Sequence, residues 1–416
     1  MSNLSGTMRS LEAERPPSSL RTFFLSLRRH TSSGLYVPEL DGLRFVAILS
    51  VFIYHLSGDV IRHNPPGVPE PTSTFYILAE RLNIGVPLFF AISGMILGLP
   101  FARFWLKGGS KVSLKRYFLR RVTRLEPPYV ITLLLFFVLK YLGDRGTIAE
   151  MLPHLGASLI YLHSLIFHEL SSINSVGWSL EVEVQFYILA PLLAMVFAIR
   201  NGWLRRMIIG AAISLAAISS PWAADSGLAR LDPADWIKHL SLAGNIQYFL
   251  TGFLLADFFL LMPPSSRRSG RWDLVTLVGW PLLGFLLVAA PQVAFTALPV
   301  AILLLYAAVF YGPLSNRAFG TVWVASIGGM CYSIYLLHNY AIALLGFGTE
   351  RIGQTLPFEA RFAIQMLLMG PVILVVSICF FRLIEQPCMR PDWPARLLAL
   401  VRTRLGLNPH STSPQA

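Results

Sequence analysis

Charged residues are scarce in this chain of 416 residues. Only 13% of its positions are Asp, Glu, Lys or Arg, which is about half the share that a soluble protein uses to cover its surface. This shortage excludes an ordinary soluble globular domain. Hydrophobic residues make up 54% of the sequence, and the mean hydropathy is +0.59. Lipid must therefore cover most of the folded surface.

Cysteine is also rare. The three cysteines, Cys331, Cys379 and Cys388, lie in or beside apolar segments and lack the spacing of a metal site. This pattern excludes a disulfide framework and indicates packing residues, so no metal is expected. The first apolar run begins only near Leu43, beyond a long polar tail. We therefore expect no cleavable signal peptide.

The chain divides into three parts by composition. Residues 1–34 are rich in Ser, Pro and Arg and predict a disordered cytoplasmic tail. Residues 35–390 carry the apolar runs of a transmembrane domain. Residues 391–416 predict a cytoplasmic tail, in which leucines and arginines at helical spacing over 395–407 favour an interfacial amphipathic helix.

The apolar runs predict an all-α bundle of about ten transmembrane helices, since each crossing needs about 20 apolar residues. The ten runs are 43–61, 77–101, 125–142, 178–199, 207–223, 243–262, 274–290, 293–311, 323–346 and 362–384.

The net charge of +12 fits this topology. With the N-terminus in the cytoplasm, most Lys and Arg residues fall in inside loops, as the positive-inside rule requires. Residues 155–170 are apolar enough to be an eleventh span, but a crossing there would remove most of that bias. We expect this segment to be re-entrant or interfacial on the outer side, and both termini to be cytoplasmic.

Ionisable residues inside spans are costly and are functional candidates. Arg44 and His55 are eleven residues apart in the first span. That spacing places them on one helix face, about 16 Å apart along the axis. Asp41 lies one turn before Arg44 and is expected to pair with it. The alternative for His55 is an interior histidine that is hydrogen-bonded across the bundle.

The fourth span begins WSLEVEVQFY and brings two carboxylates, Glu181 and Glu183, into the apolar region. They are two residues apart and point to nearly opposite sides, so only one can share a cavity with His55. The alternative is a headgroup position in which Trp178 anchors the helix and one carboxylate stays solvated. Residues one turn from the two carboxylates are candidate supporting groups: Trp178, Gln185 and Tyr187.

The loop between the second and third spans is strongly basic, and its sequence is RFWLKGGSKVSLKRYFLRRVTRLEPPY. Topology alone explains a basic inside loop. Arginines also suit a donor that carries several phosphates, and Arg121 and Arg124 are the candidates for that second role.

The ninth span contains CYSIYLLHNY, in which Tyr335 and His338 lie one turn apart. They indicate either a cavity wall or a histidine at the outer interface. The last span ends FRLIEQP, and Arg382 and Glu385 at i, i+3 predict an ion pair near the cytoplasmic face.

Six motifs occur in one order: PELDGLRFVAILSVFIYH, GVPLFFAISG, RRVTRLEPPY, SVGWSLEVEVQFY, YSIYLLH and LIEQP. From about residue 36 to 390, this series resembles the membrane acyltransferase-3 family of bacterial O-acyltransferases, which modify O-antigens, exopolysaccharides, Nod factors and macrolides. The Arg-x10-His signature of that family falls on Arg44 and His55, and its carboxylate falls on Glu183.

The resemblance implies ten helices in a bacterial inner membrane, an acyl-CoA co-substrate from the cytoplasm, and a carbohydrate or glycolipid acceptor. Many members carry a further hydrolase-like domain. This chain ends without one, so we expect it to act alone or with separate partners of envelope-glycan biosynthesis; no nucleic acid is expected.

The expected reaction moves an acyl group, acetyl by default and succinyl or longer as alternatives, to a sugar hydroxyl. His55 would act as base or transient acyl carrier, Glu183 would orient it, and Arg44 would contact the donor's phosphates or hold Asp41. A different class fits the same residues: a transporter or flippase of a lipid-linked glycan that uses an intramembrane proton relay. The sequence does not identify the acceptor.

Overall fold

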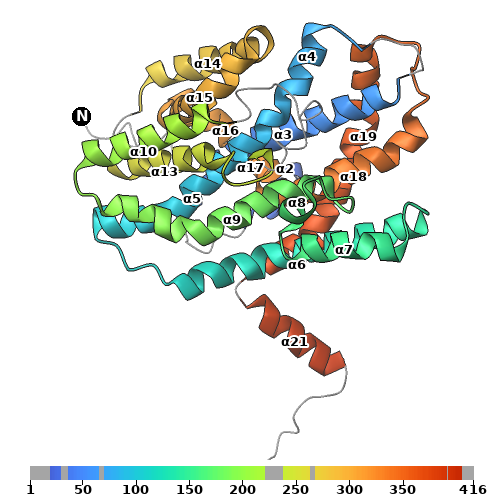
Figure 1. Cartoon of the computed structure of the whole chain (residues 1–416), viewed down its shortest axis with the longest axis horizontal. Helices are drawn as coiled ribbons and strands as arrows, with labels where there is room; N and C mark the ends of the chain where they lie inside the picture. Colours follow the sequence, from blue (N-terminus) through green and yellow to red (C-terminus); the bar gives the residue numbers. More distant parts are fainter. Residues whose placement is uncertain are drawn as a thin grey trace, which may run out of the picture.

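The computed structural model describes residues 19–29, 36–64, 70–220, 238–262, 268–390 and 392–404. Over these residues the chain forms helices and no strands, which confirms the predicted all-α membrane class (Figure 1). Each of the ten predicted spans coincides with a helix or a pair of helices. In chain order, these helices are α3 (Pro38–Arg62), α4 (Thr74–Arg81) with α5 (Gly85–Lys107), α6 (Leu114–Leu142), α9 (Trp178–Leu193), α10 (Gly202–Ile218), α13 (Ile246–Leu261), α14 (Gly270–Ala289), α15 (Pro291–Tyr311), α17 (Val322–Gly329) with α18 (Cys331–Thr349), and α19 (Phe358–Phe380).

The count of ten spans is only partly supported. Among the described residues, seven helices are long and apolar enough to cross a membrane, and α17 with α18 makes an eighth if that bent pair is one span. Helix α13 is apolar but has only 16 residues. Helix α10 has 17 residues, and the rest of its predicted run lies outside the described residues. The two remaining spans are therefore shorter than the usual crossing length.

Residues 155–170 form no continuous span. Helix α7 (Ile148–Leu159) follows α6 after a short turn, and Tyr161 stacks on Tyr129 near the middle of α6. After the short α8 (His163–Phe167), the chain returns to the end of α6, where Lys140 donates to the carbonyl of Ser172. The segment is therefore a helical hairpin, which runs from the end of α6 back to the middle of α6 and then returns to its end.

Glycines allow a close helix contact between α5 and α13. A Cβ on Gly94 would overlap the backbone of Phe249, and one on Gly252 would overlap the backbone of Ala91. Glycine is required at both positions because the two backbones touch.

We expect Gly94→Ala to destabilise the protein by about 1–3 kcal/mol, since a rigid backbone stands where the methyl group would go. Gly210→Ala on α10 is the matched control, because a Cβ there meets nothing within 4 Å. Thermal unfolding in detergent should show a lowered midpoint for Gly94→Ala alone. Equal midpoints for both variants would contradict the close contact.

Part of the N-terminal tail is helical, so the prediction of disorder is wrong for residues 19–29. Helix α2 (Ser19–Ser26) packs Phe24 against Trp323, and Ser326 donates a hydrogen bond of 2.7 Å to the carbonyl of Phe24. Leu27 is fully buried. The remainder of the predicted tail, residues 1–18 and 30–34, lies outside the described residues.

Helix α21 (Trp393–Arg404) lies away from the bundle beyond the last span (Figure 1). It coincides with most of the amphipathic segment predicted over 395–407. The Nε1 of Trp393 donates to the carbonyl of Thr123 at 2.8 Å and so joins α21 to the basic start of α6. That α21 lies in the membrane interface stays a prediction.

Candidate active site

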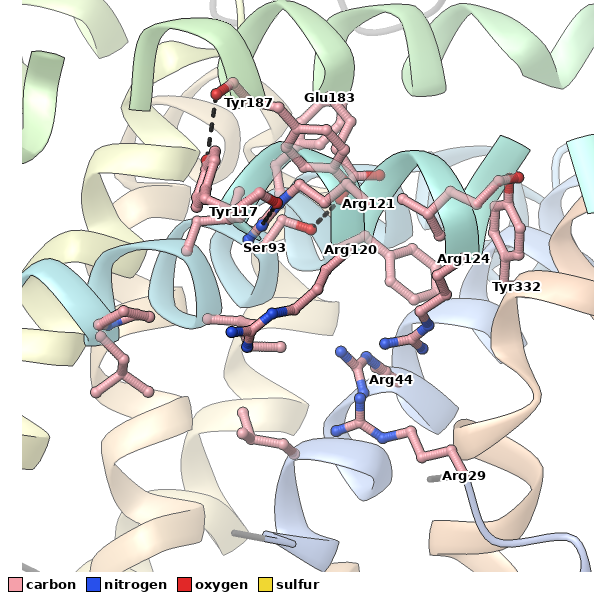
Figure 2. A pocket seen from close by; sticks show the side chains of 18 of the residues that line it. Arg29, Arg44, Ser93, Tyr117, Arg120, Arg121, Arg124, Glu183, Tyr187 and Tyr332 are labelled. Atoms are coloured by element: carbon pink, nitrogen blue, oxygen red, sulfur yellow. Dashed lines mark hydrogen bonds between the residues drawn. The ribbon is translucent and has the colours of Figure 1, made fainter. Parts of the chain in front are cut away.

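A cavity of about 700 Å³ opens within one end of the bundle (Figure 2). Helices α3, α5, α6, α9 and α18 line it, together with residues 109–113. Its apolar part includes Val86, Phe89 and Phe90. Basic side chains dominate the polar part: Arg29, Arg44, Arg103, Lys111, Arg116, Arg120, Arg121 and Arg124. The cavity therefore suits an anionic group joined to a long apolar arm.

The basic loop predicted from sequence supplies most of these cations. Arg116, Arg120 and Arg124 stand at i, i+4 and i+8 on α6, so one helix face presents all three. The Nε of Arg124 is buried without a hydrogen-bond partner. This regular spacing is a signal beyond topology, and it could have identified Arg116 and Arg120 from the sequence.

Arg121 is held differently from Arg124. Its guanidinium lies 3.7 Å from the ring centre of Tyr117 and 5.4 Å from that of Tyr187. Its Nη1 donates to the carbonyl of Tyr117 at 2.7 Å. Arg121 is thus fixed against two aromatic rings of the cavity wall.

The expected pair of Asp41 and Arg44 is confirmed, at 2.5 Å between Oδ1 and Nη1. Asp41 is fully buried and also binds Arg29, whose Nε lies 2.8 Å from Oδ1. One carboxylate therefore holds two guanidinium groups. Figure 2 shows these groups of Arg29 and Arg44 near each other at the cavity. Arg29 belongs to the tail segment predicted to be disordered, and the sequence analysis missed it.

Glu183 faces the same cavity from α9. Its carboxylate accepts a hydrogen bond from the hydroxyl of Ser93 on α5 (Figure 2). Tyr187 lies one turn further along α9, and its carbonyl accepts from the Tyr117 hydroxyl at 3.2 Å. Among the described residues, no hydrogen bond or ion pair joins Glu183 to His55. The geometry therefore does not give Glu183 the expected contact with the imidazole.

His55 instead meets a second histidine. The Nε2 of His338 on α18 lies 3.1 Å from the Nδ1 of His55, and the ring centres are 4.8 Å apart. The Nδ1 of His338 lies 2.8 Å from the carbonyl of Tyr335 and 3.1 Å from that of Ile334. His338 is fully buried.

These contacts fix the tautomers of the neutral pair. A carbonyl only accepts, so the proton of His338 is on Nδ1 and its Nε2 is an acceptor. The Nδ1 of His55 lies between this acceptor and the carbonyl of Val51, 2.9 Å away, so it carries the proton. The Nε2 of His55 is then left with a free lone pair. That is the arrangement required of a base or a nucleophile.

Tyr335 lies at the cavity and next to His338. It lines the cavity, its ring centre is 5.7 Å from that of His338, and its hydroxyl lies 2.6 Å from the hydroxyl of Ser179. Tyr335 therefore belongs to the cavity wall, which was one of the two alternatives for the ninth span, and His338 is buried next to it. His55 and His338 do not line the cavity themselves.

Two candidate supporting residues lie elsewhere. Trp178 is buried edge-on against Phe90, which does not fit an anchor in the headgroup region. The Oε1 of Gln185 accepts from the backbone N–H of Leu242 at 3.0 Å, so this side chain holds the segment before α13. Glu181 accepts from the backbone N–H of Ser164 at 2.8 Å and fixes the start of α8.

The predicted ion pair of Arg382 and Glu385 is wrong. Glu385 accepts from the backbone N–H of Ser333 at 3.1 Å and from its hydroxyl at 2.5 Å. Arg382 donates to the hydroxyl of Ser26 and lies over the ring of Phe23. Both residues lie in a π-helical turn, Phe381–Glu385, in which residues at i and i+3 do not share a face as they do in an α-helix. The two side chains therefore point in different directions and contact different helices.

Comparison with known proteins gives the family. A family model described as an acyltransferase domain, of the acyltransferase-3 type, matches residues 37–382. No solved structure matches the chain.

Two relatives illustrate the range of matches. The peptidoglycan O-acetyltransferase OatA of Listeria monocytogenes is 27% identical over 202 residues, which cover 46% of this chain and 29% of that protein. The exopolysaccharide production protein ExoZ of Rhizobium meliloti is 26% identical over 323 residues, which cover 76% of this chain and 92% of that protein. The match thus spans less than a third of the first relative and nearly all of the second. With the family model matching most of its length, the chain belongs to the acyltransferase-3 family of membrane acyltransferases.

Proposed function

We propose that the protein is a membrane O-acyltransferase that moves an acyl group, acetyl by default, from acyl-CoA to a hydroxyl of a cell-surface or lipid-linked carbohydrate. The observation that carries this proposal is the placement of two features on one helix. Helix α3 presents Arg44 to the arginine-lined cavity, and His55 meets His338 about three turns further along the same helix.

The cavity fits an acyl-CoA donor. Phosphate groups of the donor would lie against Arg44, Arg120 and Arg124, where guanidinium groups offer paired donors. The pantetheine arm would run along the apolar wall of Phe89 and Phe90 toward Tyr335. Arg124 has donor capacity to spare, because its buried Nε has no partner.

The Nε2 of His55 would remove the proton from the acceptor hydroxyl as its oxygen attacks the thioester carbonyl. The C–O bond forms, the C–S bond breaks, and the thiolate of CoA leaves with the proton that His55 took up. In the two-step form, Nε2 attacks the thioester, the N–C bond forms, the C–S bond breaks and CoA leaves as the thiolate. The sugar hydroxyl then attacks the acyl-imidazole, a C–O bond replaces the C–N bond, and the hydroxyl proton that is released balances the proton that the thiolate takes up. This second form suits a donor and an acceptor that arrive from opposite faces.

His338, and not Glu183 as expected from the sequence, would orient the imidazole of His55. It would hold His55 in the tautomer with a free Nε2, as a third group orients the base of a catalytic triad. Glu183, with Ser93 and Tyr187, would shape the cavity wall and balance the charge of Arg121.

A carbohydrate acceptor is supported by the names of the relatives, which refer to peptidoglycan O-acetylation and to exopolysaccharide production. A bacterial inner membrane with both termini in the cytoplasm accords with the basic residues around the cavity, since inside loops collect Lys and Arg. This orientation would open the cavity to cytoplasmic acyl-CoA.

Mass spectrometry of surface glycans in a deletion strain tests the function. We expect the glycans to remain on the surface and to lose their acyl groups. Wild-type protein supplied in trans should restore the acyl groups, and His55→Ala should not.

The competing transporter gives a different result in the same strain. A flippase deletion would remove the glycan itself from the surface and leave the acylation of any remaining glycan unchanged. That outcome would overturn the proposed function.

A further inference from the structure

A second group of ligating side chains lies in the hairpin of α7 and α8, apart from the arginine-lined cavity. His154 comes from α7, His163 begins α8, and Glu169 follows α8. One ligand atom of each residue lies within 4.8 Å of the others. The Nδ1 of His154 and the Nε2 of His163 are 2.8 Å apart. The proposed acyl transfer uses none of these groups.

The chain reversal that gathers them is firmly built. Tyr161 and His168 both have left-handed backbones, at φ 58° and 57°, and they bracket α8. Such conformations are costly for bulky residues and persist where the surroundings fix them. Here Ser158 and Ser171 hydrogen-bond at 3.0 Å across the base of the hairpin, and Glu181 of α9 holds the backbone of Ser164 at 2.8 Å.

The surroundings of these three residues suit a cation-binding site that is buried on one side and open to solvent on the other. His163 is fully buried, and the ring of Phe167 covers both imidazoles, with ring centres 4.2 Å from His154 and 4.9 Å from His163. Glu169 is exposed and closes the group on the solvent side. Two imidazoles and one carboxylate are a ligand set that zinc favours, at about 2.0–2.2 Å from each atom, with a fourth position for water.

We propose that His154, His163 and Glu169 bind a divalent transition-metal ion, with zinc as the preferred ion. The ion would replace the direct contact between the two imidazoles and clamp α7 to α8. Because Glu181 ties α8 to the helix that carries Glu183, the clamp would stiffen one wall of the acyltransferase domain from outside the cavity. This site could not be predicted from the sequence, because the three residues meet only through the chain reversal at Tyr161.

The test uses the full-length protein, purified in detergent without a polyhistidine tag and stripped of metal. Zinc chloride is titrated in, and the bound zinc is measured by elemental analysis after gel filtration. Cobalt chloride provides a second readout, since a tetrahedral cobalt site with nitrogen and oxygen ligands absorbs visible light. We expect one zinc per chain and a higher midpoint of thermal unfolding with zinc than without it.

The variants His154→Ala and Glu169→Gln should each weaken zinc binding by at least about tenfold, since the loss even of a supporting partner typically has that effect. Glu169 is exposed, so its substitution leaves the fold intact, and gel filtration confirms this. His168→Asn is the matched control: this histidine is also exposed in the same hairpin, and asparagine tolerates its left-handed backbone. It should bind zinc as the wild type does.

Two results would overturn the proposal. One is no zinc above background in the wild-type protein, which would leave a plain hydrogen bond between two histidines. The other is wild-type zinc content in both His154→Ala and Glu169→Gln, which would place any bound zinc elsewhere on the surface.

Discussion

His55→Ala is expected to lower acyl transfer by at least about 10²–10⁴-fold, the range that a general base contributes. If His55 carries the acyl group, the loss should be complete. The physical reason is the free lone pair of Nε2, which the contacts of Nδ1 with Val51 and His338 leave available. Turnover of purified protein with acetyl-CoA and a glycan acceptor measures the effect, and gel filtration confirms that the variant is folded.

Substitution of His338, the hydrogen-bond partner of His55, should also slow acyl transfer. His338→Leu removes the acceptor beside Nδ1 and should lower kcat by roughly 5- to 10-fold, because a hydrogen bond is worth about 1–1.5 kcal/mol and its loss lets His55 adopt the tautomer that is protonated on Nε2. His338→Gln places an amide oxygen near the same position and should recover part of the rate. The KM for acetyl-CoA should stay unchanged in both variants, since His338 does not line the cavity.

A purely structural role for His338 would show a different pattern. Both variants would then lose folded protein in parallel, and the glutamine would give no rescue of kcat per folded molecule. Wild-type turnover in His338→Leu would contradict the positioning role directly.

The second large effect is expected from the arginines of the cavity. Arg124→Ala should raise the KM for acetyl-CoA by roughly 10- to 100-fold, because a hydrogen bond to a charged group contributes about 1.5–3 kcal/mol. Its buried and unpartnered Nε makes Arg124 the best placed of the α6 arginines for a phosphate. Steady-state kinetics with varied acetyl-CoA measures the change.

A truncated donor isolates the phosphate contact. Wild-type protein should prefer acetyl-CoA strongly over acetyl-pantetheine, which lacks the nucleotide, and Arg124→Ala should lose much of that preference. Arg62→Ala is the control, because Arg62 is 66% exposed at the far end of α3 and does not line the cavity. An unchanged KM in Arg124→Ala would remove this residue from the donor site.

Much of the site follows from local spacing. The eleven-residue interval of Arg44 and His55 places both on one face of α3, and the pair of Asp41 and Arg44 needs only the i, i+3 rule. The helices follow from the apolar runs in the same way. Helix α2 also carries a readable signal, since Leu20, Phe23, Phe24 and Leu27 recur at helical spacing in a segment otherwise rich in serine and arginine.

The long-range partners could not be predicted. His55 and His338 are 283 residues apart, and their contact depends on how α18 packs against α3. The Asp41 carboxylate gains Arg29 only because α2 docks on α17. Spacing within a helix predicts which residues share a face of that helix. Which other helix packs against that face depends on how the whole bundle is assembled.

An ionisable residue inside a predicted span does not always belong to a functional site. Asp257 on α13 is fully buried and binds Arg205 at 2.5 Å and Arg206 at 2.8 Å, which joins α13 to α10 away from the cavity. Glu181 likewise serves the backbone of α8. Buried ionisable groups that have complete partners within the fold are structural, and Arg124, which lacks one at Nε, remains the candidate for a ligand.

The most direct test of the account is a single-turnover reaction of the purified protein in lipid nanodiscs with labelled acetyl-CoA and a glycan acceptor. Transfer of label to the glycan, followed by mass spectrometry, should occur with the wild type and be lost in His55→Ala at equal amounts of folded protein. Label transfer at the wild-type rate in His55→Ala would contradict the central claim, as would the absence of label transfer by folded wild-type protein.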